Sequence, residues 1–198
     1  MIEIYTDGSS SKNRAGWGFV AVLDGTVIYE KAGQDIPSAT NQLMELTAAI
    51  EACDWVEQTE YINEHDVIIY SDSAYLVNCY KDKWWSSWET NGWKNSKGDP
   101  VANMLSWRFL IKFFKKPNYS FQKVKGHAGN VYNERADDLA QGKATLGECH
   151  DLTCQKKCDI IYMKLSEKLK ILNDDSTLIN NVVNDILKIL KQEGINIE

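Results

Sequence analysis

The sequence has no long hydrophobic run, and we expect no leader segment. No apolar stretch approaches the roughly 20 residues that a membrane-spanning helix needs. Met1 is followed at once by Ile2-Glu3-Ile4-Tyr5, an alternation of apolar and polar residues that is typical of a strand and leaves no room for a signal sequence. We therefore expect a soluble protein with no membrane partner and a cytoplasmic location.

The sequence also lacks a disulfide framework and an excess of positive charge. Its five cysteines are an odd number. Cys53 and Cys79 fall in apolar, helix-like patterns that favour reduced thiols. The net charge is −6, whereas proteins that recognise phosphate usually carry a basic surface. Binding of nucleic acid therefore requires either a local basic surface or metal ions that supply positive charge.

The first 140 or so residues alternate between strand-like and helix-like patterns, which is typical of an α/β domain. Strands are predicted at residues 1–7, 16–23, 26–32, 66–71 and 119–124. Helices are predicted at residues 41–56, 73–80, 82–90, 100–115 and 131–144. Asp24-Gly25 is a strong tight-turn signal, so the first three strands are expected to form an antiparallel meander.

The pattern changes after Gly142, so we place a first domain at residues 1–144, a linker at 145–158 and a helical hairpin at 159–198. The linker contains Cys149, His150, Cys154 and Cys158, which offer four soft metal ligands, so a zinc site stays open as an alternative although their spacing does not match a standard one. Each hairpin helix has an apolar face that needs burial. The hairpin is expected to pack on the first domain, to contact another protein or to mediate self-association, and we otherwise expect a monomer.

Acidic residues stand at unusual places in four separate segments of the first domain. Asp7 and Asp72 each follow an apolar strand, and neighbouring strands lie about 4.8 Å apart. On a helical wheel Glu45 flanks the apolar stripe of its helix, whereas Glu51 points away from it. If the fold gathers such acids, their repulsion makes the cluster costly unless divalent cations neutralise it. The pattern therefore predicts a two-metal site for phosphoryl transfer.

Helical phase also separates two adjacent acids near the end of the domain. With Ala136 and Leu139 taken as the packed face, Asp137 lies at the margin and Asp138 nearly opposite. Asp137 is the better ligand candidate. His127 stands between glycines in a loop, where an imidazole can exchange protons near neutral pH without holding metal.

Five segments in this order resemble ribonuclease H type I over roughly residues 1–144. They are Thr6-Asp7-Gly8-Ser9, Asn41-Gln42-Leu43-Met44-Glu45-Leu46, Ser71-Asp72-Ser73, Val124-Lys125-Gly126-His127-Ala128-Gly129 and Asn133-Glu134-Arg135-Ala136-Asp137. The resemblance implies a ribonuclease H-like fold, with a five-stranded mixed sheet flanked by helices. It also implies an endonuclease that cleaves the RNA strand of RNA·DNA hybrids, leaving 5′-phosphate and 3′-hydroxyl ends, in the removal of primers or hybrids during replication and repair.

The resemblance assigns roles to individual residues. It implies that Asp7, Glu45, Asp72 and Asp137 bind two Mg²⁺ ions, for which Mn²⁺ is a substitute, and that His127 assists proton transfer or product release. The residues that it places at the hybrid are Asn13, Asn41, Gln42, Trp84, Trp88, Trp93, Lys94 and Lys125. Asn41 is also available as a helix cap, and at least one tryptophan is expected in a small local core.

The sequence departs from this family around the tryptophans. Glu89, Thr90 and Asn91 stand where relatives usually carry a basic cluster, which predicts weaker hybrid binding. Two other functions remain open on the sequence. One is a hybrid-binding module that has lost catalysis and is recruited through the hairpin. The other is a nuclease of the same superfold that acts on DNA.

Overall fold

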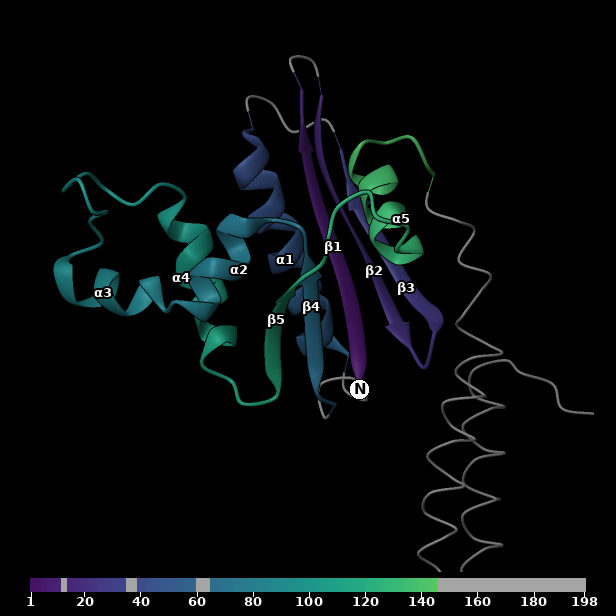
Figure 1. Ribbon diagram of the computed structural model, residues 1–198, viewed down its shortest axis with the longest axis horizontal. Coiled ribbons are helices and arrows are strands. Elements are labelled where there is room, and N and C mark those ends of the chain that lie inside the picture. Colours follow the sequence, from purple (N-terminus) through teal and green to yellow (C-terminus); the bar gives the residue numbers. More distant parts are fainter. Residues whose placement is uncertain (12–13, 35–38, 60–64, 146–198) are drawn as a thin grey trace, which may run out of the picture. The chain divides into compact units, whose positions relative to one another are not determined.

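The computed structural model describes residues 1–11, 14–34, 39–59 and 65–145, whose arrangement Figure 1 shows. A five-stranded mixed sheet runs through this part of the chain in the order β3-β2-β1-β4-β5. Its strands are β1 (Ile2–Ser10), β2 (Ala15–Leu23), β3 (Thr26–Gly33), β4 (Val67–Ser71) and β5 (Tyr119–Lys123). The first three strands are antiparallel, and β1, β4 and β5 are parallel. The expected fold class is therefore confirmed.

Helices cover both faces of the sheet (Figure 1). They are α1 (Asn41–Gln58), α2 (Ala74–Lys81), α3 (Trp84–Asn91), α4 (Met104–Phe114) and α5 (Val131–Ala140). The larger core joins α1, α2 and α4 to one face through side chains such as Phe19 and Ile69. The smaller core joins α5 to the other face through Tyr5, Val20 and Leu139. This separation follows from the alternation of side chains along each strand.

Local sequence explains the element boundaries. Asp24 and Gly25 both have positive φ, as the tight turn between β2 and β3 requires. Thr40 is the N-cap of α1, because its side chain accepts a hydrogen bond from the Leu43 N–H at 3.2 Å. Three predicted boundaries were wrong by three residues or more. α4 begins at Met104 rather than at residue 100, and α5 ends at Ala140 rather than at residue 144. β1 continues to Ser10, so Asp7 lies inside the strand rather than at its end. Its long pairing with β2, from Ile2 to Ser10, holds this extension in place.

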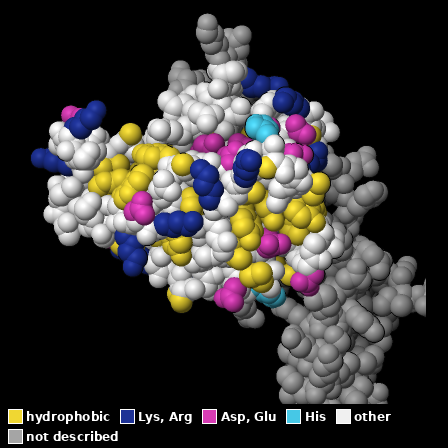
Figure 2. Space-filling model, in the orientation of Figure 1, with side chains coloured by type: hydrophobic (Ala, Val, Ile, Leu, Met, Phe, Trp, Pro, Cys, Tyr) yellow, Lys and Arg dark blue, Asp and Glu magenta, His cyan; other side chains and the backbone are white. Residues whose placement is uncertain are grey.

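Charged side chains are unevenly spread over the surface. Figure 2 shows acidic side chains gathered beside a histidine, with lysine or arginine side chains nearby. The hydrophobic side chains on the same face lie mainly in two areas, one toward the end of the molecule that carries α3. Lysine and arginine side chains also lie elsewhere on this face, including the end that carries α3 (Figure 2).

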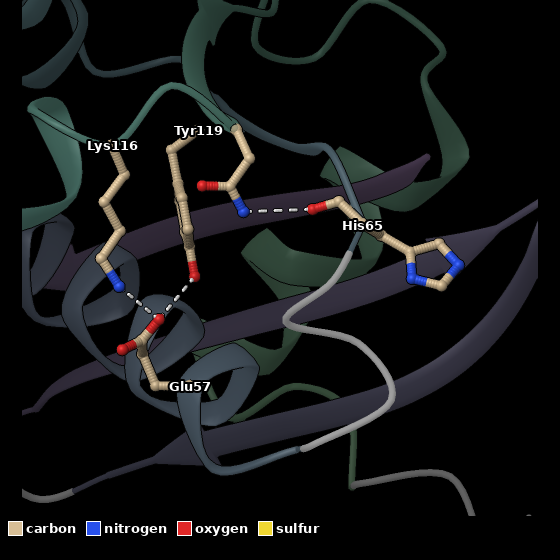
Figure 3. Close-up of polar contacts among 5 residues, drawn as sticks. Glu57, His65, Lys116 and Tyr119 are labelled. Carbon is tan, nitrogen blue, oxygen red and sulfur yellow. Dashed lines mark hydrogen bonds and ion pairs between the residues drawn. The ribbon is translucent and has the colours of Figure 1, made fainter.

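A polar network fixes the start of β5 against the end of α1 (Figure 3). Glu57 on α1 accepts hydrogen bonds from Lys116 Nζ at 2.6 Å and from the Tyr119 hydroxyl at 3.5 Å. Asn118 donates to the backbone carbonyl of His65 at 3.3 Å. These contacts hold β5 and β4 in register at the end of the sheet where both strands begin.

Several expectations fall on residues that the structure does not describe. Asn13, the linker beyond residue 145 and the C-terminal hairpin lie outside the described residues. Within the described part, Cys53 and Cys79 are free, buried thiols. In the same part of the chain, none of the helices has the length and apolar character that crossing a membrane requires.

Candidate active site

Two parallel strands bring Asp7 and Asp72 together. Thr6 on β1 pairs with Ser71 on β4, so the two aspartates are the next residues along neighbouring strands. Asp7 is 7% exposed. Asp72 leaves the end of β4 just before Ser73, whose side chain caps α2. The sheet register therefore sets the position of both carboxylates, one inside β1 and one just beyond the end of β4.

Glu45 reaches the same place from α1 because Gly8 has no side chain. A Cβ built on Gly8 would overlap the backbone of Met44 and would lie 2.7 Å from the Glu45 Cα. This close approach lets α1 rest directly on β1, and Glu45 is only 7% exposed. Glu51, the alternative acid on this helix, instead forms an ion pair with Lys31 at 2.6 Å.

The three carboxylates form one compact cluster. Asp7, Glu45 and Asp72 each offer an oxygen, and these oxygens all lie within 4.8 Å of one another. Burial, followed by the charges of Asp72 and Asp137, raises the pKa of Asp7 to about 8. Burial, followed by the charges of Asp7 and Asp72, raises the pKa of Glu45 to about 9. The pKa of Asp72 is also raised, again mainly by burial. The cluster is therefore poorly compensated by the protein alone.

The donor set suits a hard divalent cation. All three side chains are carboxylates, and Glu45 Oε2 is buried without a hydrogen-bond partner among the described residues. Its other oxygen, Oε1, is 3.5 Å from the side-chain amide of Asn41. An unpartnered, buried carboxylate oxygen is costly unless a ligand satisfies it. The site is thus compatible with divalent metal binding, and a cation there would lower the raised pKa values.

Asp137 lies beside this cluster and comes from the opposite layer of the fold. It is carried by α5, which packs directly on β2: a Cβ on Gly18 would lie 2.7 Å from the Leu139 Cβ and 2.9 Å from the Ala136 carbonyl oxygen. The Asp137 side chain is 14% exposed. Its charge raises the pKa values of Asp7 and Asp72, although among the described residues the compact group contains only the other three acids.

The loop that carries His127 closes one side of the site. His127 has a φ of 49° and an exposed side chain, and its Nδ1 lies 3.9 Å from Asp137 Oδ2. Gly126 fits against Asp72, because a Cβ at this position would overlap the Asp72 carboxylate. The Gly129 N–H donates to Glu134 on α5 at 2.9 Å. Lys125 is exposed at the start of the loop.

The start of α1 presents polar side chains next to the cluster. Asn41 and Gln42 are both exposed. The Asn41 side chain accepts a hydrogen bond from the Ser10 N–H at 3.1 Å. Asn41 is not the helix cap, since Thr40 fills that role. It instead links the end of β1 to the helix that carries Glu45.

A groove runs along α3 and the loop that follows it, with a volume of about 580 Å³. Trp84, Trp88 and Lys94 are among its lining residues. Trp88 is 8% exposed and packs on Trp107, so it serves the core. Trp93 lies outside the lining, with the Arg108 guanidinium 5.0 Å from its ring.

An ion pair and an exposed lysine lie near this groove. Glu89 pairs with Lys115 at 2.7 Å and so neutralises a nearby cation. Lys94 is exposed at the groove.

Sequence analysis missed one side chain at the site. Gln141 Nε2 donates a hydrogen bond to Asp137 Oδ1. The signal was available, because residues four apart face one another on a helix. Gln141 falls inside the helix expected at residues 131–144, and in the structure it is the first residue after α5.

Known proteins match the part of the chain that forms the sheet and its helices. The sequence model of a family described as RNase H matches residues 1–145. The chain is similar to the Ribonuclease H of Syntrophomonas wolfei, with 43% identity over 142 residues that make up 71% of this chain and 93% of the relative. It is also similar to the Ribonuclease H of Moorella thermoacetica, with 42% identity over 71% of this chain and 89% of the relative.

Solved structures show the same fold. The solution structure of the PFV RNase H domain has a TM-score of 0.57 and 25% identity, and the match covers 72% of this chain and 91% of that one. The crystal structure of LC11-RNase H1 in complex with an RNA/DNA hybrid has a TM-score of 0.55 and 23% identity, with coverage of 72% and 95%. At this identity the likeness concerns the fold alone.

The family model and the relatives both cover the part of the chain that forms the sheet and its helices. The chain belongs to the RNase H family. The resemblance found in the sequence and the enzyme class expected from it are confirmed.

Proposed function

We propose that this chain is an endonuclease that hydrolyses the RNA strand of RNA·DNA hybrids with the help of two divalent cations. Mg²⁺ is the proposed ion, and Mn²⁺ a substitute. The products are a 5′ phosphate and a 3′ hydroxyl, and the biological role is the removal of RNA primers or hybrids during replication and repair. The observation that carries the proposal is the compact group formed by Asp7, Glu45 and Asp72, whose oxygens lie within 4.8 Å of one another.

Four carboxylates would hold the cations. Asp7, Glu45 and Asp72 supply the compact group, and Asp137 approaches it from α5. When bound, paired divalent cations activate a water for in-line attack on a phosphate and stabilise the departing oxygen. The protein holds these ligands on two strands and two helices, so little reorganisation is needed at the moment of reaction.

His127 supplies the mobile proton in this proposal. Its imidazole is exposed on the loop and lies 3.9 Å from Asp137 through Nδ1. The geometry allows the ring to exchange a proton with solvent while Asp137 orients it. This role does not require His127 to bind a metal ion.

The hybrid would lie across the site and the α3 groove. Asn41 and Gln42, exposed beside the cluster, are short donors and acceptors suited to the 2′ hydroxyl in a minor groove. Trp84 and Lys94 line the groove, where an aromatic ring and a cation suit a nucleic-acid strand. Lys125 would contact phosphate near the His127 loop. Because Glu89 neutralises Lys115, we expect this surface to bind the hybrid weakly and with a shallow salt dependence.

A substrate panel tests the proposal. Labelled RNA·DNA hybrid, duplex RNA and duplex DNA are incubated with the full chain in Mg²⁺, in Mn²⁺ or in EDTA. The proposal requires that only the hybrid is cut, that only its RNA strand is cut, and that EDTA stops the reaction. An uncut hybrid in both metals would support a binding module that has lost catalysis, and cutting of duplex DNA would indicate a different nuclease.

Two variants extend the panel: Asp72→Asn tests a proposed ligand, and Asp138→Asn is its control. Asp72→Asn keeps the shape of the side chain but weakens a ligand, so we expect turnover to fall by at least about 100-fold while the hybrid still binds. Asp138→Asn removes the carboxylate next to Asp137, which is not part of the compact group, and its turnover should match that of the parent chain. Equal turnover of both variants would refute the role of Asp72.

A further inference from the structure

Asp137 presents its two carboxylate oxygens to different partners. Oδ1 accepts the hydrogen bond from Gln141 Nε2, and Oδ2 faces His127 Nδ1 at 3.9 Å. The carboxylate is 14% exposed, so water has limited access to it. Gln141 therefore determines which oxygen of Asp137 is turned toward the loop and which is engaged on the helix.

The position of Gln141 is itself fixed by side chains from two other segments. The Gln34 amide donates to the carbonyls of Leu139 at 2.5 Å and of Ala140 at 3.2 Å. Arg14 donates to the carbonyl of Gln141 at 3.4 Å. The last carbonyls of a helix have no partner within the helix, so these contacts secure the C-terminal turn of α5. The Gln141 side chain consequently starts from a backbone that is held by Gln34, which follows β3, and by Arg14, which precedes β2.

Asp137 needs such support more than the other acids do. Asp7 and Asp72 are set by the sheet register, and Glu45 by the close packing of α1 on Gly8. Asp137 instead lies beside the compact group on a separate layer of the fold. A free carboxylate rotates about its terminal bond with little preference. Without a donor on Oδ1, Asp137 would sample orientations in which no oxygen points toward the cluster.

We infer that Gln141 is a positioning residue for the metal centre: it holds Asp137 Oδ1 so that Oδ2 remains available to a divalent cation. This inference rests on the proposed function, because it takes Asp137 as a ligand. It adds a role for a residue outside the acid cluster. Partners that orient metal ligands in this way typically change metal affinity or activity by about 10–100-fold when they are removed.

The chain offers a matched control for the experiment. On α1 the Gln58 amide donates to Asp54 Oδ2 at 2.5 Å, across the same four-residue spacing that separates Gln141 from Asp137. This second pair is exposed and does not belong to the acid cluster. Gln141→Met and Gln58→Met therefore remove the same kind of hydrogen bond while keeping the length of the side chain.

Metal binding to the full chain without nucleic acid provides the first measurement. Mn²⁺ is titrated into each protein, and binding is followed by calorimetry and by the shift of the melting temperature. We expect Gln141→Met to weaken Mn²⁺ binding about tenfold, and Gln58→Met to leave it unchanged. In single-turnover cleavage of hybrid, Gln141→Met should require about tenfold more metal for half-maximal rate, with no change in the KM for hybrid.

Side-chain amide NMR of the metal-free protein gives an independent test of the contact. Asp137→Ala should move the Gln141 amide resonances and leave those of Gln58 in place. Unmoved Gln141 resonances, or a Gln141→Met variant with the Mn²⁺ affinity of Gln58→Met, would overturn the positioning role while leaving the proposed function intact. Failure of the parent chain to bind metal and to cut hybrid would overturn the proposed function, and this inference with it.

Discussion

The acid cluster should destabilise the metal-free protein, and Asp7→Asn should relieve part of that cost. The pKa of Asp7 is raised from 3.8 to about 8, by burial first and then by the charges of Asp72 and Asp137. The pKa of Asp7 is higher in the folded protein than in the unfolded chain, so the stability contribution of its protonated carboxyl is fully present below about pH 4. This contribution is lost as the pH rises through about 8. The parent chain should therefore lose stability across this window in EDTA.

The size of the effect follows from the same shift. At pH 7 a carboxyl with these two pKa values costs the folded state about 4 kcal/mol. Because asparagine still has to be buried as a polar group, we expect Asp7→Asn to recover about 2 kcal/mol, or about 6 °C in melting temperature. The stability gained by Asp7→Asn should be smaller at pH 5, because most of the destabilisation by the Asp7 carboxyl arises above this pH.

Thermal and urea unfolding in EDTA at pH 5, 7 and 8.5 measure this gain. Asp138→Asn serves as the control, since it removes an acid from the same helix as Asp137 but outside the cluster. Saturating Mg²⁺ should reverse the order, because the parent chain gains a ligand that the variant binds poorly. An Asp7→Asn variant that is no more stable than the control at pH 7, with the same pH dependence, would refute the raised pKa.

Three further outcomes are expected. Mg²⁺ should raise the melting temperature of the parent chain more at pH 8 than at pH 5.5, because protons compete with the metal for acids whose pKa values are raised to about 8 and 9; equal shifts at both pH values would contradict this. Gly8→Ala should force α1 away from β1, lower the free energy of unfolding by about 2 kcal/mol or more, and reduce hybrid cleavage relative to the parent chain, because its Cβ would overlap the backbone of α1; stability and cleavage equal to those of the parent chain would exclude the close packing. Trp84→Ala should raise the KM for hybrid about tenfold through lost stacking, with kcat unchanged, in steady-state cleavage assays; an unchanged KM would exclude the groove from binding.

Much of the fold was predictable because its signals are local. The Asp24-Gly25 turn, the meander and the apolar strand Val67–Ser71 appear in the sequence as turn chemistry and periodicity. Helical phase also favoured Glu45 over Glu51, and in the structure Glu51 forms a surface ion pair with Lys31. These features depend on residues that are close along the chain.

What the sequence did not reveal depends on contacts between distant segments. The close packing of α1 on Gly8 and the contact of Gly126 with Asp72 arise only when the layers assemble. The extension of β1 beyond Asp7 comes from its pairing with β2. None of these contacts leaves a periodic pattern in the sequence.

Anomalous diffraction from crystals of the chain grown with Mn²⁺ tests the central claim most directly, which is that acids from four segments form one divalent metal centre. The predicted result is Mn²⁺ density bounded by the carboxylates of Asp7, Glu45 and Asp72, with Asp137 Oδ2 completing the ligand set. Crystals of Asp72→Asn should show weaker density at the same place. Absence of density between these carboxylates in the parent chain, or density confined to other acids, would contradict the claim.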